Sequence, residues 1–105
     1  RKTGGAQGAF WVSLAGQIQF CREDVGRHVA MDKLVGALIR EGYSPSHGFI
    51  LVTSRASFEM VQKAVAARVG LLVALSAPTY LAIELAKEMN LQLAAFSRID
   101  KINLY

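Results

Sequence analysis

Apolar residues in the first part of the chain follow two different spacings. Residues 8–14 form a short, mostly apolar run, and residues 17–23 alternate polar with apolar side chains. With Ala15-Gly16 as a turn, these segments predict an antiparallel hairpin. From Asp24 the spacing becomes helical, and Gly42 predicts where that helix ends. The apolar side of this helix comprises Met31, Leu34, Val35, Leu38 and Ile39.

The rest of the chain repeats a pattern of buried strand followed by helix. Continuous apolar runs of strand length predict buried, parallel strands. These predicted strands cover residues 49–53, 71–75 and 91–96. Residues 102–105 are predicted to add one further short strand, with no direction assigned. The helices between them are predicted over residues 57–68 and from Pro78, in the first turn, to Glu88 or Met89, with Asn90 as the cap. A hairpin followed by parallel strand–helix repeats predicts an α/β fold with about five strands and three helices.

Length and composition support one domain. The chain has 105 residues, of which 52% are hydrophobic, which is enough for a core and too many for disorder. No run of about 18 apolar residues predicts a transmembrane helix. The chain begins Arg1-Lys2-Thr3, without Met or an apolar signal region. We therefore expect residues 1–105 to be a single domain that is part of a longer protein.

Charge and cysteine content narrow the chemistry. The net charge is +4, with basic residues spread along the chain, which supports a mild preference for anionic ligands. Nucleic-acid binding is the weakest interpretation, because such proteins cluster their basic residues. A single cysteine, Cys21, excludes an internal disulfide and a zinc site that needs two thiolates. Its position in the middle of a predicted strand favours a packed core cysteine over a reactive one.

Hydroxyl and charged residues follow each predicted buried strand. In open α/β sheets, ligands bind beyond the carboxyl ends of the strands, near helix N-termini. Hydroxyls, helical N–H groups and arginines together predict an anion site there. The alternative is that the hydroxyls only cap helices and the arginines are solvated. The residues are Ser54, Arg55 and Ser57 after one strand, Ser76, Pro78 and Thr79 after the next, and Ser97, Arg98, Asp100 and Lys101 after the last.

The start of the first helix carries polar groups on its apolar side. Arg27 and His28 fall at the edges of the apolar stripe, where they need a cleft or partners. Asp32 lies four residues after His28, so its carboxylate can orient the imidazole. Asp24 is a candidate N-cap, and Glu23 can pair with Arg27. The alternative is a polar network that only closes the helix end.

Several ordered motifs stand out along the chain. The main one is Glu23-Asp24-Val25-Gly26-Arg27-His28, followed by Met31-Asp32-Lys33-Leu34. The others are Thr3-Gly4-Gly5, residues 54–63, Ser76-Ala77-Pro78-Thr79 and Phe96-Ser97-Arg98. Together these motifs resemble one family, the formate dehydrogenase accessory sulfurtransferases (FdhD-like sulfur carriers), and the agreement extends from Thr3 to Tyr105.

This resemblance implies a three-layer α/β/α sandwich with a cytidine-deaminase-like fold, this chain being the C-terminal cofactor-binding part. It implies a cytoplasmic homodimer that accepts sulfur from a cysteine desulfurase and passes it to the Mo-bis(molybdopterin guanine dinucleotide) cofactor of formate dehydrogenase. A guanine nucleotide is then a partial ligand. The family's cofactor-binding stretch corresponds to Phe96, Ser97, Arg98, Ile99, Asp100 and Lys101. We expect Ser54, Arg55, Ser76, Thr79, Arg27 and His28 to complete the site.

Some family features are absent or changed. The Cys-x-x-Cys loop that carries sulfur in the family is not in these 105 residues, so no catalytic residue is assigned here. Gln7 stands where the family often has His, and Val29 where it often has Asn. The sequence has neither H-x-E nor P-C-x-x-C, which excludes a zinc deaminase, and no metal ligand is predicted. Two functions remain: a cofactor-binding domain of a sulfur carrier, or a non-catalytic dimerisation and interaction module without nucleotide affinity of its own.

Overall fold

The fold is a mixed six-stranded sheet with three α-helices. A computed structural model describes residues 7–98 and 101–105, apart from the side chains at positions 27, 28, 97 and 98. The elements in chain order are β1 (Gln7–Ser13), β2 (Ile18–Asp24), α1 (Arg27–Glu41), a short 3-10 helix (Pro45–His47), β3 (Gly48–Arg55), α2 (Phe58–Ala66), β4 (Leu71–Ser76), α3 (Tyr80–Glu88), β5 (Gln92–Arg98) and β6 (Lys101–Leu104).

Strand order confirms the predicted hairpin and the strand–helix repeats. The order across the sheet is β2-β1-β3-β4-β5-β6. β3, β4 and β5 are parallel neighbours, whereas β1 pairs antiparallel with both β2 and β3. β6 pairs antiparallel with β5, which confirms the further short strand predicted over residues 102–105 and brings the sheet from about five strands to six.

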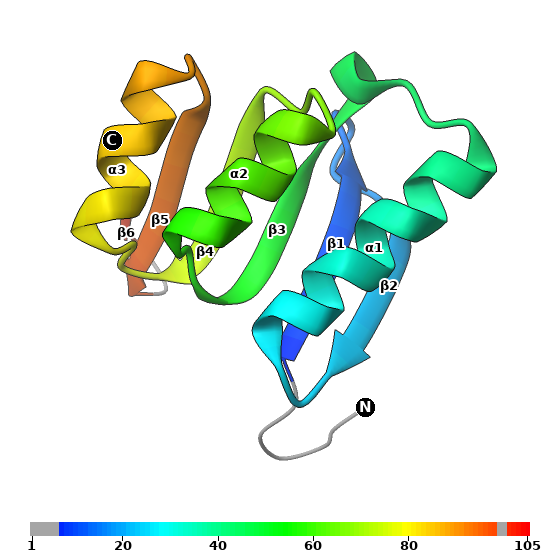
Figure 1. Cartoon of the computed structure of the whole chain (residues 1–105), viewed down its shortest axis with the longest axis horizontal. Coiled ribbons are helices and arrows are strands. Elements are labelled where there is room, and N and C mark those ends of the chain that lie inside the picture. Colours follow the sequence, from blue (N-terminus) through cyan, green and yellow to red (C-terminus); the bar gives the residue numbers. More distant parts are fainter. Residues whose placement is uncertain (1–6, 99–100) are drawn as a thin grey trace.

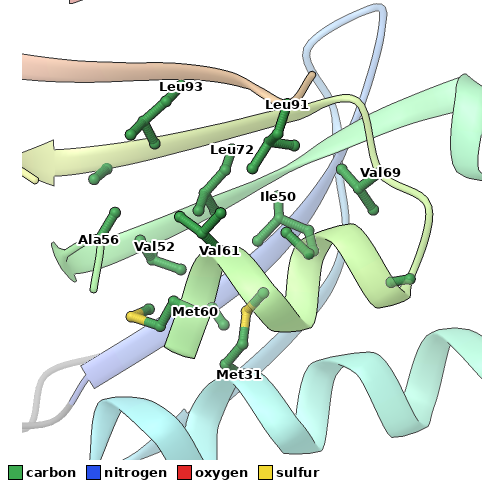
Figure 2. Packing of buried hydrophobic residues seen from close by; sticks show 14 of the residues in the cluster. Met31, Ile50, Val52, Ala56, Met60, Val61, Val69, Leu72, Leu91 and Leu93 are labelled. Carbon is green, nitrogen blue, oxygen red and sulfur yellow. The ribbon is translucent and has the colours of Figure 1, made fainter. Parts of the chain in front are cut away.

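All three helices lie on the same face of the sheet, in front of the strands in Figure 1. This arrangement follows from right-handed crossovers that all advance in one direction across the sheet, from β2 to β3, then β4, then β5. The core lies between the helices and this face. Figure 2 shows Val61 of α2 lying against the strands near Leu72 and Ile50, and Met31 of α1 beside α2.

The opposite face of the sheet carries a second set of apolar side chains, because side chains alternate along each strand. We call its central depression the second-face hollow; it measures about 480 Å³. No helix among the described residues covers this face, so they form two layers of the expected three. The hollow is lined by Val12, Gly16, Ile18, Phe49, Leu51, Leu71, Val73, Phe96 and Ile102.

Three local predictions are wrong. Gly26, and not Asp24, is the N-cap of α1, because the chain leaves β2 through two bend residues before the helix begins. Pro78 precedes the Thr79 N-cap of α3 and so stands outside the helix. Cys21 is exposed and not packed in the core, because β2 is an edge strand and Cys21 pairs with Phe10 on the face that no described helix covers.

Candidate functional site

The carboxyl ends of β3, β4 and β5 meet at one rim of the sheet, along the lower edge in Figure 1. Arg55 and Ser76 are register partners across β3 and β4 at this rim. Lys101 pairs with Arg98 where β5 turns into β6. Asp24 ends β2, which runs in the same direction as β3, so the start of α1 belongs to the same rim. Within residues 7–98 and 101–105, the topology therefore places the strand ends that carry the predicted site residues at one rim.

Three helix N-termini lie at this rim, and those of α2 and α3 are each capped by a hydroxyl. Ser57 Oγ accepts a hydrogen bond from the backbone N of Met60 at 3.4 Å in α2. Thr79 Oγ1 accepts one from the backbone N of Ala82 at 3.1 Å in α3. Capping satisfies one of the four N–H groups that a helix leaves unpaired, so further donors stay available at each end.

The two N-termini differ in charge. The first turn of α2 contains Glu59, whose carboxylate opposes an anion at that end. The first turn of α3 contains no acidic residue. Because the helix dipole favours anions at an N-terminus and no acidic residue stands in its first turn, α3 provides a better anion site than α2.

Arg55 spans the gap between the ends of β3 and β4. Its Nε donates to the carbonyl oxygen of Ala77 at 2.7 Å, and its Nη2 donates to that of Pro78 at 3.3 Å. The backbone N of Thr79 donates to the carbonyl oxygen of Ala56 at 3.0 Å. These bonds join the loop after β3 to the loop that enters α3.

The remaining predicted site residues have varied surroundings. Ser54 Oγ donates to the neighbouring carbonyl of Arg55 at 3.2 Å. The ring of Phe96 lines the second-face hollow and so lies on the face opposite the helices. Lys101 is exposed. The side chains of Arg27, His28, Ser97 and Arg98, and all of Ile99 and Asp100, lie outside the described residues.

An ion pair fixes the entrance of α1. Asp24 accepts from the Lys33 Nζ at 2.8 Å through Oδ2 and from the backbone N of Gly26 at 3.2 Å through Oδ1. These bonds, chiefly the one to Lys33, hold the pKa of the Asp24 carboxyl below its ordinary value. The sequence spacing predicts that Asp32 orients His28. In the structure, Oδ1 of Asp32 lies 3.2 Å from Nζ of Lys63 in α2. Among the described residues, one ion pair thus joins α1 to the end of β2 and another joins α1 to α2.

Further hollows lie elsewhere on the described surface. One, of about 320 Å³, lies at the amino ends of β4 and β5, opposite the rim, beside Gly70, Asn90 and Tyr105. Another, of about 330 Å³, lies between α2 and α3 beside Val65 and Met89. Within residues 7–98 and 101–105, no three His, Cys, Asp or Glu side chains gather as metal ligands would. No helix in that part of the chain is long and apolar enough to cross a membrane.

Two features escaped the sequence analysis. The bonds of Arg55 to the Ala77 and Pro78 carbonyls depend on strand register, which a single sequence does not reveal. The apolar second face could have been predicted from the sequence. Continuous apolar runs such as residues 49–52 place large apolar side chains on both faces of a strand.

The sequence of this chain is similar to those of known proteins. The sequence matches the FdhD/NarQ family over residues 1–105. It is 57% identical over 103 residues to the sulfur carrier protein FdhD of Variovorax paradoxus, and 55% identical over 103 residues to that of Bordetella petrii. Each match covers 98% of this chain and 37% of the relative, so the chain spans a little over a third of these curated relatives.

A solved structure agrees with the sequence match. A crystal structure of a proposed formate dehydrogenase accessory protein from Desulfotalea psychrophila superposes with a TM-score of 0.89 at 30% identity. The superposition covers 99% of this chain and 46% of that one. The family expected from the sequence motifs is thereby confirmed: the chain belongs to the FdhD/NarQ family.

Proposed function

We propose that this chain is the cofactor-binding domain of a sulfur carrier for formate dehydrogenase. It would bind the guanine nucleotide part of the Mo-bis(molybdopterin guanine dinucleotide) cofactor at the rim. The observation that carries this proposal is the N-terminus of α3, where Thr79 caps a helix whose first turn has no acidic residue. Family membership supports the choice of ligand.

The rim suits the anionic part of that cofactor. A pyrophosphate needs N–H donors, hydroxyls and cations, and the end of β4 with the start of α3 supplies Ser76 and the α3 backbone N–H groups. Lys101, exposed beside the end of β5, adds a cation. Arg98 ends β5 next to Ser76's strand and is the proposed second cation. The described groups, which are Ser76, Lys101 and the α3 backbone N–H groups, support binding of a nucleoside diphosphate.

The chemistry of the whole protein goes beyond binding. When bound, the cofactor supplies the molybdenum centre that receives sulfur, which the carrier would obtain from a cysteine desulfurase in the cytoplasm. No residue of this chain is assigned to the transfer, because Cys21, its single cysteine, lies on the edge strand β2 and not at the carboxyl ends of β3, β4 and β5. The role proposed for these residues is to hold and orient the nucleotide.

Calorimetric titration with GDP tests the proposal. Wild-type chain should bind GDP, and Arg98→Ala should weaken binding about tenfold or more, because a charge-assisted hydrogen bond contributes roughly 1.5–3 kcal/mol. Arg40→Ala is the matched control. It removes the same charge from the last turn of α1, the end of the helix that lies away from the rim. Full-strength GDP binding by Arg98→Ala would refute the role given to Arg98.

The second-face hollow favours a second candidate function, association with another copy of the chain. Ile18 and Ile102 are 60% and 50% exposed on this face. The area of this face follows from six strands at a spacing of about 4.8 Å, with about 3.3 Å per residue along each strand. It is of the same order as the ~800 Å² that each partner contributes to a standard protein–protein interface. A homodimer through this face would bury these apolar side chains.

Sedimentation velocity across a concentration series tests this second candidate. The wild-type chain should form a concentration-dependent dimer, and Ile102→Lys should shift it to monomer, because a buried unpaired ammonium is costly. Ile39→Lys serves as the control, since Ile39 is 66% exposed on α1, away from this face. A wild-type chain that stays monomeric at every concentration, or an Ile102→Lys variant that dimerises like wild type, would rule out this interface.

A further inference from the structure

We infer that Arg55 is a positioning residue, which fixes the N-terminus of α3 in place for the nucleotide and does not serve primarily as a phosphate ligand. This inference rests on the proposed function. It differs from the role that the sequence predicts for Arg55, which is that of a cation in the anion site.

The hydrogen bonds of Arg55 carry the inference. Two of the five guanidinium N–H groups already donate to consecutive carbonyl oxygens, those of Ala77 and Pro78. A planar guanidinium can reach two acceptors at once because its donors form a rigid fork. These two carbonyls belong to the loop that leads directly into the Thr79 cap.

A backbone bond completes the connection. The N–H of Thr79 donates to the carbonyl of Ala56, the residue directly after Arg55. Ala56 and Pro78 are buried, whereas Arg55 and Ala77 are exposed. The backbone bond from Thr79 to Ala56 therefore lies beside buried residues, whereas the bond from Arg55 to Ala77 joins two exposed residues. On the exposed side, the loop is bound to the end of β3 through the Arg55 side chain.

The consequence concerns the cradle that receives the anion. Residues 77–79 have no regular secondary structure, so their position depends on these bonds to the end of β3. If Arg55 is truncated, the loop gains freedom and the donors at the start of α3 are no longer preorganised, which costs affinity. The core is untouched, because Arg55 itself buries little surface.

Amide hydrogen exchange on the nucleotide-free chain tests the inference directly. Arg55→Ala should raise the exchange rate of the Thr79 amide about tenfold or more, given two lost hydrogen bonds, and should lower Tm by only roughly 5–10 °C. Arg55→Lys keeps the charge but replaces the rigid fork by a single ammonium, so it should also raise the exchange rate. Arg40→Ala should leave the Thr79 amide as in wild type.

GDP titrations of the same variants separate positioning from charge. Positioning predicts that Arg55→Lys binds GDP about as weakly as Arg55→Ala, whereas a phosphate ligand would be rescued by lysine. Unchanged Thr79 exchange in Arg55→Ala, or full rescue of GDP affinity by Arg55→Lys, would overturn the inference. If wild type binds no GDP, the proposed function fails, while the exchange rates still decide whether Arg55 holds the loop.

Discussion

Replacing Gly48 by alanine is expected to lower the free energy of unfolding by about 3 kcal/mol, in the range of severe overpacking. A Cβ at Gly48 would lie 2.5 Å from the Val12 carbonyl oxygen and 2.8 Å from the Trp11 ring. The Val12 oxygen belongs to a paired strand, so it cannot retreat without breaking the β1–β3 ladder. Trp11 is held in turn by edge-to-face contact with Tyr43, at 5.6 Å between ring centroids.

Thermal unfolding followed by circular dichroism measures this effect. A loss of about 3 kcal/mol corresponds to a fall in Tm of roughly 10–20 °C for a domain of this size. Gly70→Ala is the control, because a Cβ there has no heavy atom within 4 Å. Equal Tm values for Gly48→Ala and Gly70→Ala would show that β1 and β3 do not approach as closely as described.

Leu72→Ala is expected to cost about 2–5 kcal/mol, the range for deleting a buried leucine side chain. Leu72 is 0% exposed at the centre of the helix-covered face, where it belongs to the main core cluster. The cavity left by alanine is bounded by strand backbone and helix α2, which leaves little room for collapse. Urea unfolding at low protein concentration, where a dimer would dissociate, measures the loss.

Leu71→Ala is the matched control for Leu72, because the two are neighbours in β4 and point to opposite faces. Leu71 lines the second-face hollow and is only partly buried. Its truncation should cost less than half as much as that of Leu72. Equal losses at the two positions would contradict the assignment of one covered and one open face.

Much of the fold could be predicted from apolar spacing alone. Each buried strand appeared as a continuous apolar run, and Gly42 ends α1 in the left-handed conformation that glycine favours, at φ 69°. The observed ends of the helices and strands differ from the predicted ones by at most three residues. β6 was harder to place, because Lys101–Leu104 is short and mostly exposed, and only its pairing with β5 defines it.

The candidate site was only partly predictable. Topology is enough to place Ser76 and Thr79 together, because parallel strands end at the same rim. The bonds of Arg55 and the pairing of Asp32 with Lys63 depend on distances between elements far apart in the sequence. Cys21 is exposed because β2 is an edge strand of the sheet. The alternation of polar and apolar residues in β2 does not predict whether the strand lies at the edge or in the centre.

The central claim is that the rim at the carboxyl ends of β3, β4 and β5 binds a guanine nucleotide. Calorimetric titration of the wild-type chain with GDP, beside Arg98→Ala and the charge-matched Arg40→Ala, tests it most directly. The account predicts saturable binding by wild type and Arg40→Ala, and affinity reduced about tenfold or more in Arg98→Ala. No binding by wild type, or equal affinity in all three proteins, would contradict it.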